Sequence, residues 1–295
     1  MDFDFNSIPV PFRMQPGLQR VVRVGLRPLE YGSALYEEKQ RVVKAGQSRF
    51  QVPGYEPAHA LRAIAEQAQP GLGNAAVDTI DTPLELNFQE DLAVIDGLTG
   101  KLLWLAICTP SHWAPEEKIG MDFSTLHGPV PDNALLLQAR SQLLALVTSG
   151  ACWTRSVFTV TPSARYDQHP TRHEREPWPE ALNMAPADFA AQCFLRAERQ
   201  GFFPVADERG KPTGEAVFSI RVMLQPLTQA VKTTVQARRL HGALGSMSDA
   251  VLAYKNLTAA KAPIMAWLES LGVSAPPATP ATPATSPTSM PPAPL

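Results

Sequence analysis

The sequence has little of what marks a disulfide-stabilised or metal-cluster protein. Its three cysteines, Cys108, Cys152 and Cys193, are far apart and form no C-x-x-C pair. That spacing argues against a zinc site or an iron–sulfur cluster held by this chain alone. The odd number also argues against a disulfide framework, which is typical of a protein in a reducing compartment.

Long hydrophobic runs and an excess of one charge are also absent. No stretch approaches the ~18 apolar residues that span a bilayer, and the first residues lack the basic start and apolar run of a signal peptide. Lysine and arginine total 26 against 28 aspartates and glutamates, a net charge of -2. Such a balance favours neither nucleic acid nor an anionic membrane as a partner. We therefore expect a cytoplasmic protein, and its oligomeric state stays open.

Nucleotide-binding motifs are missing as well. The sequence contains no P-loop, no nucleophile elbow and no dinucleotide-binding glycine pattern. Nucleotide-dependent chemistry by this chain itself is therefore not expected, although a partner protein can still use NADPH.

Hydrophobic residues make up 44% of the 295 residues, enough for a sizeable core. The expected fold class is α+β: an antiparallel β-sheet with flanking helices and a C-terminal helical part. We expect an N-terminal irregular and helical segment packed on the core (1–83), a sheet domain (84–227) and C-terminal helices (228–272). The last segment, 273–295, is almost entirely Pro, Ala, Thr and Ser, and is predicted to be a disordered tail.

Local patterns place the expected elements. Strands are predicted in 84–96, 101–110, 152–160, 194–203 and 216–224 from apolar, β-branched or alternating runs. Helices are predicted in 35–43, 57–66, 114–119, 134–147, 227–244, 247–254 and 259–271. Residues 122–133 are predicted to form a loop because of Gly128, Pro129 and Pro131, with Asn133 capping the next helix. Residues 161–186, polar and rich in proline, form a long excursion of the kind that is often functional.

His127 is the histidine whose surroundings are most unusual. It lies in the segment TLHGPVP, where proline and glycine restrict the backbone. A histidine held in this way can bind a metal through one ring nitrogen while a carbonyl orients the other. From the residues alone, an ordinary loop histidine is the more common occurrence. His169 and His173 have ligand-like H-x-x-x-H spacing, but Pro170 argues against a helix that would align them.

A second group of polar residues lies on predicted strands. In RAER (196–199), Arg196 and Glu198 share one face of the strand, and Arg199 points to the other. Arg221 stands alone in the apolar run FSIRVML. Burying a charged side chain within a sheet costs free energy unless the charge forms an ion pair or binds a ligand. The residues fit two explanations equally: a structural salt bridge of Glu198 with Arg196 or Arg221, or a polar pocket on the sheet.

Six segments carry a resemblance to a known family. They are GLRPLE (25–30), QEDLAVID (89–96), SHWAPEEKIGMDFSTLHGPVP (111–131), FLRAERQGFFPV (194–205), AVFSIRVMLQPL (216–227) and LAYKNL (252–257). In this order and spacing the sequence resembles the haem-dependent oxidative N-demethylase α-subunit family. The resemblance extends over about 10–271 and leaves out the tail.

The resemblance implies a PAS-like sheet that binds haem b. It implies an oxidoreductase of the monooxygenase type, which uses O2 to demethylate a small amine such as dimethylamine and forms formaldehyde. Electrons would come from NADPH through separate subunits that carry flavin and an iron–sulfur cluster. His127 becomes the candidate iron ligand, and Lys118 and Arg199 become candidate partners of the haem propionates. Glu198, Arg196 and Arg221 would surround the open side of the iron, where Glu198 holds the amine and an arginine stabilises developing negative charge.

The sequence also departs from the family pattern and leaves an alternative open. Family members often read Ile-Arg-Thr-Tyr where this chain reads Ile220, Arg221, Val222 and Met223. A thioether thus replaces a phenol, which leaves the substrate open. The alternative function is a haem-PAS gas or redox sensor, or a haem-binding module without turnover, because a fold does not fix a function.

Overall fold

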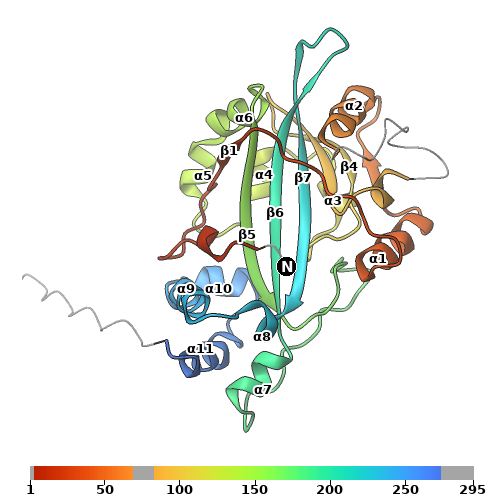
Figure 1. Ribbon diagram of the computed structural model, residues 1–295. Helices are drawn as coiled ribbons and strands as arrows, with labels where there is room; N and C mark the ends of the chain where they lie inside the picture. Colours follow the sequence, from red (N-terminus) through yellow and green to blue (C-terminus); the bar gives the residue numbers. More distant parts are fainter. Residues whose placement is uncertain (1–2, 69–82, 274–295) are drawn as a thin grey trace, which may run out of the picture.

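The computed structural model describes residues 3–68 and 83–273. Its centre is a seven-stranded sheet in the order β1-β5-β6-β7-β3-β4-β2, in which every neighbouring pair is antiparallel. The strands are β1 (Gln19–Val21), β2 (Arg49–Gln51), β3 (Asp91–Asp96), β4 (Leu102–Ala106), β5 (Cys152–Thr161), β6 (Phe194–Ala206) and β7 (Pro212–Pro226). In Figure 1 the long strands β5, β6 and β7 run side by side through the middle of the molecule, and the β6–β7 hairpin projects beyond the sheet.

The five longer strands have a distinctive order. Numbered from β3 onward, they lie in the sheet as 2-1-5-4-3, with β3 central between β4 and β7. This is the order of a PAS-like sheet, and the predicted PAS-like α+β class is confirmed. The short strands β1 and β2, both from the N-terminal segment, pair with β5 and β4 and form the two edges of the sheet.

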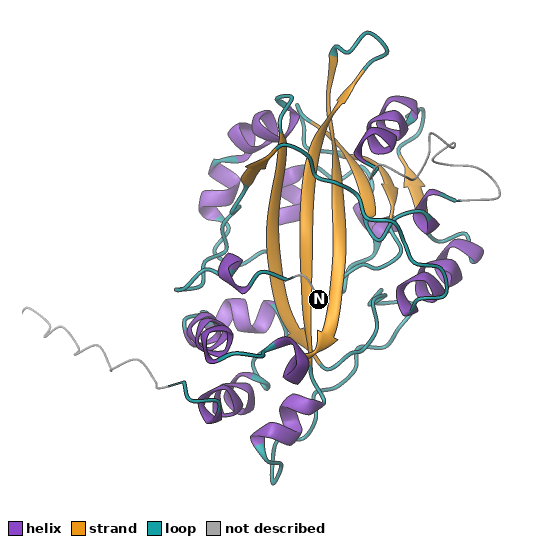
Figure 2. Cartoon of the chain, in the orientation of Figure 1, coloured by secondary structure: helices purple, strands orange, loops and turns teal. Residues whose placement is uncertain are grey.

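Helices surround this sheet, as Figure 2 shows in purple. They are α1 (Ala34–Lys44), α2 (Ala58–Gln67), α3 (Pro115–Lys118), α4 (Phe123–His127), α5 (Ala134–Gln138), α6 (Arg140–Thr148), α7 (Pro186–Ala191), α8 (Leu227–Ala230), α9 (Thr234–Gly245), α10 (Asp249–Tyr254) and α11 (Lys261–Ser270). Two short 3-10 helices, Phe5–Ser7 and Leu84–Leu86, complete the regular structure of the described residues. No helix within these residues is both long and apolar enough to cross a bilayer.

Alternation along the strands gives the sheet two different faces. On the helix face, residues such as Ala197 and Phe158 join a large apolar core with α7 to α11, and Phe203 and Val217 join a second core with α2. The opposite face carries Glu198 and its neighbours at every second position. We call it the cavity face, because the cavity described below opens on it. The sheet is therefore packed on one face and hollowed on the other.

Two predictions near His127 are wrong in detail. Residues 122–133 are not all loop, because α4 forms within them. The side chain of Asp122 accepts a hydrogen bond from Thr125 N at 2.8 Å and begins the helix, and Gly128 and Pro129 come only after its last residue. Asn133 lies at the N-cap position of α5 but makes no capping bond.

Further differences concern the neighbouring helices. The helix predicted over 134–147 is divided into α5 and α6 at Ala139. The helix predicted over 35–43 is α1, and its Lys39 is fully buried. The predicted tail, 273–295, lies outside the described residues except for Val273. The proposed division of the chain at residues 84, 228 and 273 stays a prediction.

Candidate functional site

A cavity of about 740 Å³ opens on the cavity face of the sheet. Its floor has two chemically different halves. The half on β3, β4 and β7 is apolar and includes Ala93, Leu105, Ile107, Phe218 and Ile220. The half on β5 and β6 is polar and includes Arg155, Arg196, Glu198 and Gln200. The N-terminal segment, α4 to α6 and the excursion over 161–186 are among the elements that supply the other walls. The cavity thus offers an apolar surface beside a charged one, as ligand sites commonly do.

His127 lies at the wall of this cavity, as the last residue of α4. Its Nδ1 is 2.8 Å from the carbonyl oxygen of Phe123, and its ring stacks on the Phe123 ring with centroids 4.1 Å apart. Because a carbonyl only accepts, Nδ1 carries the proton and Nε2 keeps its lone pair. Burial lowers the pKa of His127, so the ring is neutral at pH 7. Within the described residues Nε2 has no hydrogen-bond partner, which leaves it available as a metal ligand.

Asn133 holds the backbone at this point. Its side-chain amide donates to His127 O at 2.9 Å and to Gly128 O at 3.0 Å. These carbonyls lie at the C-terminal end of α4, where His127 O also accepts a bond from Val130 N at 3.1 Å. The residue predicted to cap the next helix therefore fixes the end of the helix that carries His127.

Arg196 and Glu198 meet in the polar half through a third residue. Arg196 Nε donates to Ser111 Oγ at 2.9 Å, and Ser111 Oγ donates to Glu198 Oε1 at 2.5 Å. The other carboxylate oxygen of Glu198 accepts from Gln200 at 2.8 Å. No direct ion pair joins Arg196 and Glu198 within the part of the chain that the structure describes. Of the two explanations for RAER, the polar pocket is the one found.

The Arg196 guanidinium is held from behind by a buried chain of polar contacts. Its Nη2 donates to Thr109 O at 3.0 Å. Thr109 N and Oγ1 donate to Asp91 Oδ2 at 2.7 and 2.8 Å. Asp91 Oδ1 lies 3.0 Å from Lys39 Nζ of α1. All four side chains are almost completely buried, so α1 fixes the position of an arginine in the cavity.

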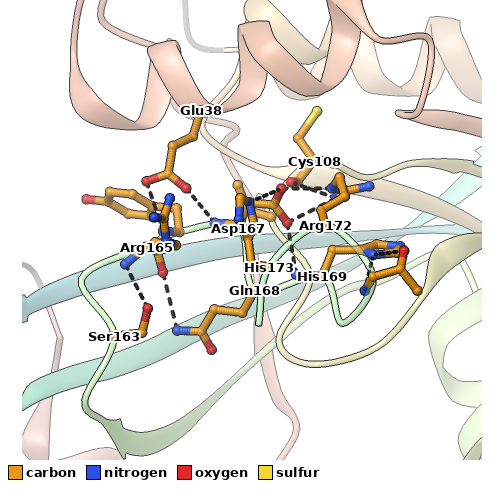
Figure 3. A network of polar contacts seen from close by, with 12 residues as sticks. Glu38, Cys108, Ser163, Arg165, Asp167, Gln168, His169, Arg172 and His173 are labelled. Atoms are coloured by element: carbon orange, nitrogen blue, oxygen red, sulfur yellow. Dashed lines mark hydrogen bonds and ion pairs between the residues drawn. The ribbon is translucent and has the colours of Figure 1, made fainter. Parts of the chain in front are cut away.

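The excursion over 161–186 is held by a polar network that Figure 3 shows. Glu38 of α1 accepts from Tyr166 N at 3.2 Å and from Asp167 N at 2.7 Å. Asp167 in turn binds Arg172 at 2.8 Å and His173 at 3.2 Å.

His169 bonds to Glu116 at 3.1 Å, so the two histidines with ligand-like spacing contact different carboxylates. The described residues contain no group of three or more His, Cys, Asp or Glu side chains that could hold a metal ion. Because Ser163, Gln168 and Trp178 line the cavity, the network fixes one of its walls.

The structure separates the six predicted site residues into two groups. His127, Lys118, Arg196 and Glu198 line the cavity. Arg199 and Arg221 do not.

These two arginines are paired across β6 and β7, and strand alternation places them on the helix face. Burial raises the pKa of Glu90, and Arg221 is among the cations that oppose this rise. Met223, which stands where the family pattern has a phenol, also packs into the core of the helix face. RAER and Arg221 therefore do not form one cluster: Arg196 and Glu198 line the cavity, whereas Arg199 and Arg221 lie on the helix face.

Sequence reasoning did not single out several charged or titratable residues of the cavity, three of which are His112, Arg155 and Lys255. His112, next to Ser111, has a left-handed backbone with φ of 60°, a conformation that clusters at functional sites. Burial, with Arg175 and Arg196, lowers its pKa to about 4. Arg155 and Lys255 are the other two. Lys255 lies in LAYKNL, one of the segments that carried the resemblance, but nothing in that segment alone indicated a cavity.

Comparison with known protein families identifies the family of this chain. A family model described as "Haem-dependent oxidative N-demethylase, alpha subunit-like" matches residues 73–265, well over half of the chain. The chain belongs to this family. The resemblance drawn from the six segments is therefore confirmed, and the family description ties its members to haem and to oxidative N-demethylation. A solved structure, the sensory box sensor histidine kinase from Vibrio cholerae, is similar at 12% identity over 45% of this chain and 81% of that chain, with a TM-score of 0.22.

The residues of the cavity fit a haem. A volume of about 740 Å³ lies within the range of roughly 300–1,000 Å³ that is common for cofactor sites. The apolar half suits the porphyrin ring, and the cations of the other half suit its two propionates. A neutral histidine with a carbonyl-bound Nδ1 is the usual form of an iron-binding imidazole.

Proposed function

We propose that the protein is the haem-binding subunit of an oxidase that removes an N-methyl group from a small amine. The reaction consumes O2, two electrons and two protons, and it releases formaldehyde, water and the smaller amine. Partner reductase subunits with flavin and an iron–sulfur cluster would supply the electrons from NADPH, in keeping with a description as an alpha subunit. The cofactor would be haem b, and it would supply the activation of oxygen.

The observation that carries this proposal is the geometry of His127. His127 lines a cavity of cofactor size, and its Nε2 makes no bond to the described protein while Nδ1–H is fixed on Phe123 O. His127 Nε2 would bind the haem iron. Lys118, at another point of the same cavity, would pair with a propionate.

The polar half of the floor would handle the amine. Glu198 would bind the protonated amine and accept its proton, because a secondary or tertiary amine is oxidised through its free lone pair. Ser111 and Gln200 would hold the two carboxylate oxygens in place. Arg196, fixed by Ser111 Oγ, Arg165 O and Thr109 O, would be a preorganised positive charge beside the reacting atoms. Arg199 and Arg221 have no part in this proposal.

The first test is haem binding by the purified protein. Wild-type protein reconstituted with haem is expected to show a Soret band, and His127→Ala is expected to lose it or to need added imidazole. His59→Ala, a histidine on α2 that does not line the cavity, is the matched control and should bind haem as the wild type does. His112→Ala tests the other histidine of the cavity. If His127→Ala keeps the wild-type spectrum, His127 is not the iron ligand.

The second test separates an enzyme from a sensor. Small amines such as dimethylamine are titrated into the ferric protein, and formaldehyde is then measured after electrons are supplied in air. A spectral shift and formaldehyde support the oxidase. Haem binding without either result, for any amine tested, refutes the oxidase and favours a sensor or a haem-binding module.

A further inference from the structure

Two cations on the β5 side of the cavity stand out because their charges are not matched. Arg155 lies on β5, where its Nε donates to Gln200 Oε1 at 2.6 Å and its Nη1 to Pro16 O at 3.4 Å. Lys255 follows α10 and donates to Phe158 O, also on β5, at 2.8 Å. Both side chains line the cavity.

Neither cation has a carboxylate within 4.0 Å in residues 3–68 and 83–273. Other buried or half-buried cations of the protein do: Lys39 lies 3.0 Å from Asp91, and Arg172 lies 2.8 Å from Asp167. The charge of Glu198 opposes the lowering of the pKa of both Arg155 and Lys255, but Glu198 forms no ion pair within 4.0 Å of either cation in the described residues. Two cations therefore share one nearby carboxylate without a direct contact to it.

The surroundings of Lys255 are apolar as well as confined. Its Nζ lies 5.6 Å from the ring centroid of Phe12 and 5.8 Å from that of Phe158. Burial lowers the pKa of Lys255 to about 8 and also lowers the pKa of Arg155. A cation held away from water without an anion is unfavourable, and a bound carboxylate restores the lost interaction.

We propose that Arg155 and Lys255 form a carboxylate-binding site on the β5 wall of the cavity. The two cations are anchored to one strand three residues apart, about 10 Å along it. Ligand carboxylates can come from two sources: the propionates of the tetrapyrrole, or the carboxylate of an amino-acid-type amine such as N-methylglycine. The first source rests on the proposed haem function, whereas the second requires only that the cavity binds the amine.

The experiment uses metal-free protoporphyrin IX, because this molecule has the propionates of haem but no iron for His127 to bind. Binding is followed by quenching of tryptophan fluorescence, since Trp113 and Trp178 line the cavity. Its dimethyl ester, which has no free carboxylates, is titrated in parallel. The full-length wild type is compared with Arg155→Gln and Lys255→Met, and Lys44→Met on exposed α1 surface serves as the charge-matched control.

If the site holds propionates, each variant binds the free acid about tenfold or more weakly, as expected for one lost charge-assisted bond. All proteins then bind the ester alike, and Arg155→Lys restores part of the affinity. If the site holds a substrate carboxylate, porphyrin affinity is unchanged, and the same two variants lose N-methylglycine binding by calorimetry but keep dimethylamine binding. Either result supports the carboxylate site.

Wild-type affinity of both folded variants for the free acid and for N-methylglycine would overturn the carboxylate site, as would a wild type that binds neither. Circular dichroism checks that each variant is folded. These outcomes do not depend on iron, electrons or turnover. Failure of the oxidase proposal would therefore appear separately, as a missing Soret band or missing formaldehyde.

Discussion

Replacing Lys39 by methionine is expected to lower the free energy of unfolding by about 3–5 kcal/mol, the usual cost of removing one member of a buried ion pair. Lys39 is 0% and Asp91 2% exposed, and Nζ lies 3.0 Å from Asp91 Oδ1. Nζ also donates to Phe88 O at 3.0 Å and Glu90 O at 2.8 Å. Methionine matches the length of lysine but provides no donor, so Asp91 would remain buried without a cation.

The surroundings of the Lys39 amine determine how its contribution to the free energy of unfolding changes with pH. Burial lowers the pKa of Lys39, but the attraction and hydrogen bond of Asp91, with smaller contributions from other groups, outweigh it and the net pKa is raised. A raised lysine pKa stabilises the fold below about pH 10.4, and this contribution is lost as the pH rises through the folded pKa. The wild type should therefore lose part of its stability at strongly alkaline pH, and Lys39→Met should lose less.

Urea unfolding followed by circular dichroism measures the effect. Lys44→Met, on the exposed surface of the same helix with a hydrogen bond only to Gln40, should change stability by no more than about 0.5 kcal/mol. Asp91→Asn keeps acceptors for Thr109 but removes the charge, so the double variant should be more stable than the sum of the single changes predicts, by about 1–3 kcal/mol. A loss below about 1 kcal/mol for Lys39→Met, or strictly additive changes, would refute the reasoning.

Two further predictions concern the Ser111 bridge and acid stability. Ser111→Ala leaves Arg196 Nε and one oxygen of Glu198 without their partner and should cost about 1–3 kcal/mol in thermal or urea unfolding; an unchanged stability would mean that water replaces the hydroxyl. Burial by itself would raise the pKa of Glu85. Hydrogen bonds from Arg49 and Ser48 lower this pKa by more than burial raises it, so the net pKa is below its ordinary value. The carboxylate therefore stabilises the fold above about pH 4.3 and this contribution is lost as the pH falls through the folded pKa; Arg49→Gln should flatten the acid limb of a stability–pH curve, and an identical limb would contradict the assignment.

Strand alternation and motif order were sufficient for much of the fold. Arg196 and Glu198 share a face because successive side chains of a strand point to opposite sides, and the same rule puts Arg199 on the other face. The strands predicted at 152–160, 194–203 and 216–224 are β5, β6 and β7, which extend a few residues further. Extended, half-buried runs of this kind carry a period of two that local sequence shows directly.

The local sequence predicted helix boundaries less well around His127, where several possible hydrogen-bond partners compete. Gly128 and Pro129 predict a loop around His127, yet the Asp122 cap starts α4 before them. Asn133 has the residue type of an N-cap, but its amide is used by the carbonyls that end α4. Both outcomes depend on which partner is nearest in space, and a sequence pattern does not carry that information.

The sequence by itself determined the alternating strands, the α+β class and the family, and it selected His127 as the candidate iron ligand, because these depend on local periodicity and on the order of short motifs. Only the tertiary structure decided which charges meet. Arg155 of β5 and Lys255 after α10 are 100 residues apart, and Lys39 reaches Arg196 through Asp91 and Thr109. Long-range placement depends on how the sheet packs against its helices and on the burial that follows. The electrostatic setting of each charge is therefore a property of the folded chain and not of its neighbours in sequence.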